Sequence, residues 1–119
     1  MDVQKFTVKG KHKLDLACIK IVPKKEPKAV IQIFHGMGEH KNRYIPFMTF
    51  LAENGYAVYA HDHRKHGESV FGQEDYGLWT HEDRFSDVID DCYFVTRKIL
   101  RDYPGSKIVV FGHSMGSII

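Results

Sequence analysis

Apolar residues are grouped at three places in the chain into short runs that do not alternate with polar residues. Strands that are buried on both faces have this pattern, and such strands are typical of parallel sheets. The sequence therefore predicts neighbouring parallel strands at 29–34, 57–61 and 107–112.

Helical patterns separate these strands. Apolar residues recur at spacings of three and four from Tyr44 to Leu51 and from Phe85 to Ile99. Pro46 fits only the first turn of a helix, and Gly55 fits the position just after a helix end. We predict helices near residues 43–54 and 82–102.

A hairpin is expected before the first parallel strand. Residues 3–8 and 14–22 are two largely apolar segments on either side of a charged turn that contains Gly10. With the strand and helix order that follows, the predicted fold is α/β: a doubly wound, mostly parallel sheet preceded by an antiparallel hairpin.

Composition narrows the class of protein. The chain has 119 residues, 43% of them hydrophobic and 27% charged, which fits a single globular domain. The net charge of +2 gives no reason to expect nucleic-acid binding. Cys18 and Cys92 are far apart and form no metal or disulfide motif, and no secretory signal is visible, so we expect a cytoplasmic protein.

Lysines are concentrated at the start of the chain. Residues 1–28 contain eight lysines and three acidic residues. This stretch is compatible with transient contact to an anionic membrane surface, although a solvated face is the simpler reading.

The strongest chemical signal is Gly-His-Ser-Met-Gly at residues 112–116, directly after the third predicted strand. A serine at a sharp strand-to-helix turn has its hydroxyl exposed above the sheet, and glycines flank it because side chains would not fit the turn. Ser114 is therefore the candidate nucleophile.

Two further loops follow predicted strands. The first strand ends in His-Gly-Met-Gly-Glu-His at 35–40, a glycine-bearing loop that can bring a backbone N–H close to Ser114. The second ends in His-Asp-His-Arg-Lys-His-Gly at 61–67. Lys65 stands where a metal site would need a carboxylate, so we expect no metal here, and we expect Asp62 to brace a tight loop.

These segments, together with Asn42-Arg43-Tyr44 and the sequence from 102 to 116, resemble the monoacylglycerol lipase and lysophospholipase branch of the α/β-hydrolases. The resemblance runs from about residue 27 to the end of the chain. It departs from the branch at Lys65 and at 70–72, where glycine and then a short turn are more usual.

The resemblance implies a serine ester hydrolase that acts on acyl esters such as monoacylglycerols or lysophospholipids, without a cofactor. Ser114 would form the acyl-enzyme, and the backbone N–H groups of Met37 and Met115 would form the oxyanion hole. The serine argues against the epoxide-hydrolase and dehalogenase branches, which use aspartate.

In this fold the acid and the histidine of the catalytic triad follow the nucleophilic serine in the sequence. Only residues 117–119 follow the Gly-His-Ser-Met-Gly turn, the nucleophile elbow, in this chain. We expect residues 1–119 to be the N-terminal part of a single α/β-hydrolase domain whose remainder supplies both residues. Expressed alone, they should be insoluble or partly unfolded and inactive. The alternative is a non-catalytic α/β-hydrolase-like fragment or binding protein.

Overall fold

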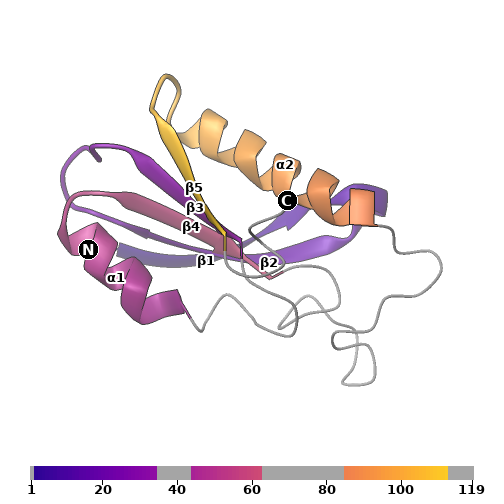
Figure 1. Cartoon of the computed structure of the whole chain (residues 1–119), viewed down its shortest axis with the longest axis horizontal. Coiled ribbons are helices and arrows are strands. Elements are labelled where there is room, and N and C mark those ends of the chain that lie inside the picture. The colour runs from indigo at the N-terminus through magenta and orange to yellow at the C-terminus, as the bar shows by residue number, and fades with distance from the viewer. Residues whose placement is uncertain (1, 35–43, 63–84, 113–119) are drawn as a thin grey trace.

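The computed structural model describes residues 2–34, 44–62 and 85–112 (Figure 1). Its elements are β1 (Asp2–Lys9), a 3₁₀ turn η1 (Lys11–Lys13), β2 (Asp15–Val22), β3 (Val30–Phe34), α1 (Ile45–Glu53), β4 (Ala57–His61), α2 (Phe85–Asp102) and β5 (Ile108–Gly112). The five strands form one sheet in the order β1-β2-β4-β3-β5.

The predicted hairpin is confirmed. β1 pairs antiparallel with β2 along its whole length, from Asp2 opposite Val22 to Lys9 opposite Asp15. Gly10 begins the turn at a φ of −91°, so its role is not a left-handed backbone. A Cβ at Gly10 would clash with the carboxylate of Asp91 on α2, and that carboxylate accepts a 2.7 Å hydrogen bond from the backbone N–H of Lys11. The turn is therefore attached to α2.

The three predicted parallel strands are also confirmed as neighbours. β3 lies between β4 and β5 and is parallel to both. Both predicted helices are present, and Gly55 ends α1 with a φ of +96°, a left-handed conformation that glycine adopts without strain. Among the helices of the described residues, none is long and apolar enough to cross a membrane.

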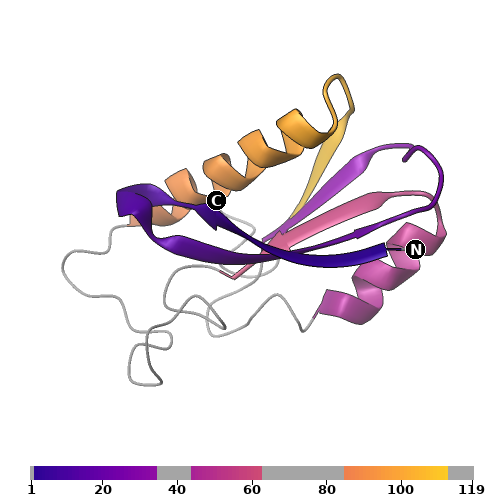
Figure 2. The ribbon, with the colours of Figure 1, turned by 180° about the vertical axis from the view of Figure 1, so that it is seen from behind.

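The two helices cover opposite faces of the sheet (Figures 1 and 2). Met48 and Ala52 of α1 pack with Val58 and Ala60 of β4 on one face. On the other face, Tyr59 of β4 packs with Ile99 of α2. Successive strand residues point to opposite faces, and a helix covers each face, so every residue of β4 is buried. The unbroken apolar run at 57–60 predicts this burial.

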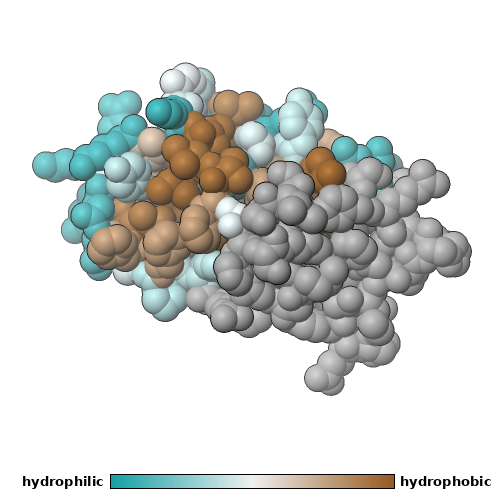
Figure 3. Space-filling model, in the orientation of Figure 1, coloured by the Kyte–Doolittle hydropathy of each residue, from teal (hydrophilic) through white to brown (hydrophobic). Residues whose placement is uncertain are grey.

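The expectation of burial on both faces is wrong for β5. Val109, Val110 and Phe111 are each 40% exposed or more. In the described part of the sheet β5 is an edge strand that pairs with β3 alone. The ring of Phe111 lies against the ring of Phe47 on α1, with centroids 5.3 Å apart. The result is an exposed hydrophobic surface over β5 and α1 (Figure 3).

A charged network joins the end of α2 to β4. The Tyr59 hydroxyl donates a 2.6 Å hydrogen bond to Asp102, and the Lys98 and Lys20 ammonium groups lie 3.0 and 3.6 Å from the same carboxylate. Burial raises the pKa of Tyr59, and so does its bond to Asp102. For Asp102, burial alone would raise the pKa, but the bonds from Tyr59 and Lys98 and the charge of Lys20 outweigh it and hold that pKa below its usual value.

The network makes a pH-dependent contribution to stability. Because the folded pKa of Asp102 is depressed, its contribution is present above the unfolded carboxyl pKa of about 3.9 and is lost as the pH falls through the lower folded value. Asp102→Asn should therefore lower the free energy of unfolding at pH 7, and the difference from wild type should shrink towards pH 3. Chemical denaturation at several pH values measures this.

Tyr59→Phe, which removes only the hydroxyl, should lower the free energy of unfolding by about 1.5–3 kcal/mol at neutral pH, as is usual for a hydrogen bond to a charged group.

Asp15→Asn is the matched control for Asp102→Asn, because the Lys9–Asp15 pair is more than 60% exposed on each side and should contribute less than about 1 kcal/mol. A difference between Asp102→Asn and wild type that stays constant with pH would contradict this assignment.

Candidate active site

The carboxyl ends of three strands lie at one edge of the sheet. Phe34, the last residue of β3, is directly opposite Gly112, the last residue of β5. β4 runs in the same direction on the other side of β3, with Ala60 opposite Ile33. Paired strands are about 4.8 Å apart, so the segments that follow Phe34 and Gly112 begin as close neighbours. In α/β sheets, ligands bind outside such carboxyl ends.

The predicted site residues Ser114, Met37 and Met115 lie outside the described residues. The same holds for Lys65. What the structure does describe is the framework from which the predicted loops leave. Ser114 is two residues beyond Gly112, and Met37 is three residues beyond Phe34.

His61 ends β4 with its side chain fully buried on the α2 face. Its ring meets the ring of Phe34 edge to face, at a centroid distance of 6.2 Å. Its Nε2 atom is 3.7 Å from the Sγ atom of Cys92 on α2. The imidazole thus fills the space between the ends of β3 and β4 and the helix that covers them.

A buried polar cluster that the sequence analysis missed fixes α2 to β3. The Gln32 amide donates a 3.2 Å hydrogen bond to the backbone carbonyl of Cys92. The Thr96 hydroxyl lies 2.7 Å from the Gln32 Oε1 atom and 3.0 Å from the same carbonyl. The only sequence signal was a glutamine inside an otherwise apolar strand, which periodicity alone treats as an interruption.

Cys92 is structural in this arrangement. Burial, and then the negative charge of Asp91, raise the pKa of the Cys92 thiol well above its usual value. A thiol must lose its proton to act as a nucleophile or metal ligand, so Cys92 is unsuited to both roles. Across 2–34, 44–62 and 85–112, no group of three His, Cys, Asp or Glu side chains is placed to hold a metal ion.

Asp62 follows directly after β4 and is fully buried. Its backbone N–H donates a 2.9 Å hydrogen bond to the carbonyl of Ala17 on β2. This bond extends the contact between β4 and β2 beyond their paired residues. The expected bracing role of the Asp62 side chain concerns that segment, which lies outside the described residues.

This architecture defines the class of the protein. An antiparallel hairpin leads into parallel strands with helices on both faces, and a serine elbow sequence follows the strand β5. The chain has the α/β-hydrolase fold. The family described as "Serine aminopeptidase, S33" matches residues 25–119, and the chain belongs to that family.

Similar proteins agree with this class. Human monoglyceride lipase is 34% identical over 87% of this chain and 32% of its own length. Monoacylglycerol lipase of Mycolicibacterium smegmatis is 33% identical over 79% of the chain and 31% of its own length. A carboxyl esterase from Bacillus coagulans, solved with glycerol, has a TM-score of 0.87 at 27% identity and is matched over 99% of this chain and 38% of its own. The chain thus spans about a third of the curated relatives that it matches.

Thr96→Val tests the cluster that connects α2 to β3. The valine keeps the shape of the side chain but leaves the buried Gln32 oxygen without its hydroxyl donor, so the free energy of unfolding should fall by about 1–3 kcal/mol. Thermal or chemical denaturation of the full-length protein gives this value.

Thr49→Val in α1 is the matched control, since Thr49 is half-buried in a helix and takes no part in the cluster. We expect a change within about 0.5 kcal/mol there. Equal effects of the two substitutions would contradict the role given to Thr96.

Proposed function

We propose that this chain supplies the nucleophile and the oxyanion hole of a serine ester hydrolase that acts on acyl esters such as monoacylglycerols or lysophospholipids. Ser114 is the nucleophile, and the backbone N–H groups of Met37 and Met115 bind the oxyanion. The names of the human and mycobacterial relatives support the ester class.

One observation carries this proposal: Phe34 and Gly112 are register partners at the carboxyl edge of the sheet. The glycine-bearing loop and the serine elbow therefore leave from adjacent positions. An oxyanion hole needs two donors, one from each of these loops, converging near one point above the nucleophile. With any other strand between β3 and β5, the two loops would start too far apart to do this.

The proposed reaction has two steps. The Ser114 hydroxyl attacks the ester carbonyl carbon, its proton passes to a histidine, and the oxygen that becomes negative is held by the two N–H groups. The alcohol leaves with that proton, and a fatty acyl group remains on Ser114. Water then attacks the acyl-enzyme and releases the fatty acid.

We further propose that the histidine and the acid are supplied by sequence beyond residue 119. In this fold both residues follow the nucleophile, and this chain spans about a third of its curated relatives. Any hydrolytic activity therefore belongs to the full-length protein.

Labelling with a fluorophosphonate probe tests the nucleophile. In the full-length protein, peptide mass spectrometry should find the phosphonyl group on Ser114, and Ser114→Ala should abolish labelling and lower kcat for a monoacylglycerol by at least about a thousandfold. Ser106→Ala is the matched control, because Ser106 precedes β5 at the opposite end of the strand and should leave both unchanged. A folded full-length protein that takes no label would favour the non-catalytic alternative.

Met115→Leu separates the backbone role of this residue from a side-chain role. The N–H that would bind the oxyanion is kept, and the side chain changes little in volume, so kcat/KM should stay within about threefold of wild type. Steady-state kinetics on a soluble short-chain ester measures this. A fall in kcat/KM of a hundredfold or more would show that the thioether side chain is required, and it would contradict the backbone role given to Met115.

A further inference from the structure

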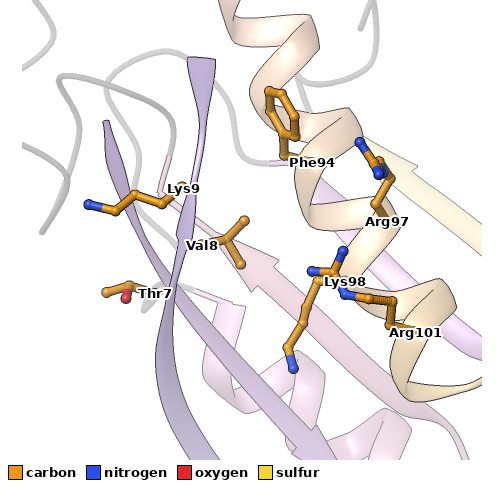
Figure 4. Close-up of a pocket in the computed structure, with 7 residues that line it drawn as sticks. All are labelled: Thr7, Val8, Lys9, Phe94, Arg97, Lys98 and Arg101. Carbon is orange, nitrogen blue, oxygen red and sulfur yellow. The ribbon is translucent and has the colours of Figure 1, made fainter. Parts of the chain in front are cut away.

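An open groove of about 490 Å³ runs between β1 and α2, at the edge of the sheet opposite β5 (Figure 4). Its lining residues are Thr7, Val8, Lys9, Phe94, Arg97, Lys98 and Arg101. In Figure 4, Val8 points towards α2, whereas Lys9 extends away from the helix. The positive charge inside the groove therefore comes from α2.

Two arginines carry the charge that is not neutralised. Lys9 binds Asp15 at 2.6 Å, and Lys98 binds Asp102 at 3.0 Å. Arg97 and Arg101 are exposed and four residues apart, so they lie on one side of the helix. Within the part of the chain that the structure describes, neither of them forms an ion pair.

The acidic residue on the same side of α2 is already engaged. Asp90 lies about two turns before Arg97, and its carboxylate is 3.5 Å from the ammonium of Lys11 in the hairpin turn. It therefore does not neutralise the guanidinium groups, which remain available to an external anion. Guanidinium groups bind phosphate with paired N–H donors, which makes a phosphate ester the best-matched ligand.

Exposed apolar side chains surround these arginines. Tyr93 is 59% exposed, and the Arg97 guanidinium lies 6.0 Å from the centre of its ring. The ring centroids of Tyr93 and Phe94 are 6.5 Å apart. Leu100 is 46% exposed on the next turn. A helix face that combines arginines with aromatic and aliphatic side chains is suited to the boundary between lipid headgroups and acyl chains. A soluble phosphate ester would use the arginines but not the apolar residues.

We propose that this face of α2 docks the protein on a membrane, with Arg97 and Arg101 holding the phosphate of an anionic phospholipid in the groove. Tyr93, Phe94 and Leu100 lie against the lipid boundary in this arrangement. The docking site is independent of the chemistry at Ser114. It also differs from the lysine-rich start of the chain, because its charge comes from α2.

The test is co-sedimentation of the full-length protein with vesicles of equal parts phosphatidylcholine and phosphatidylserine. We expect binding that falls as salt is added and is weak on phosphatidylcholine alone. Arg97→Gln/Arg101→Gln should weaken binding roughly thirtyfold, as expected for two basic residues at an anionic surface. Arg97→Lys/Arg101→Lys keeps the charge and should retain most of the binding.

Lys24→Gln/Lys25→Gln is the matched control, because it removes the same charge from two exposed lysines that do not line the groove. It should weaken binding much less than the arginine pair. Equal losses in the two double variants would overturn the proposal, as would an absence of vesicle binding. Complete displacement from vesicles by soluble glycerol phosphate would also overturn it, and would assign the groove to a free phosphate ester.

Discussion

Parallel pairing of β3 with both β4 and β5 is the constraint on which the rest of the structure depends. It sets three carboxyl ends at one edge of the sheet, and it requires helical crossovers to connect strands that run in the same direction. Those crossovers are α1 and α2, one on each face. Because both faces are then covered, β4 is buried along its whole length and its register is strongly specified.

The polar groups buried near this edge hold the helix α2 in place. Gln32 bonds to the α2 backbone, Thr96 bonds back to Gln32, and Asp91 holds the hairpin turn through the N–H of Lys11. Burying polar groups is costly unless they are hydrogen-bonded, and these bonds meet that requirement while fixing direction, which apolar packing alone does not do. The strand β3, which precedes the predicted glycine-bearing loop, is therefore fixed to α2.

Most of the fold could be predicted from the sequence, because periodicity reports directly on burial. The unbroken run of β4 and the helical stripe of α2 each identified their element, and Gly55 identified the end of α1. Exposure of β5 was missed because periodicity describes the strand and not its neighbours. Gln32 was missed because a single polar residue gives no sign of its partner, which is 60 residues away in the chain.

The type of site could be predicted from the Gly-His-Ser-Met-Gly sequence around Ser114. Its geometry depends on the segments that follow β3 and β5. The central claim is that the loops after β3 and β5 converge on one oxyanion. A crystal structure of the full-length protein after reaction with a phosphonate ester tests this most directly. We expect phosphorus bonded to Ser114 and a phosphonyl oxygen about 3 Å from the N–H groups of Met37 and Met115. An adduct on another residue, or an oxygen that meets donors from only one of the two loops, would contradict it.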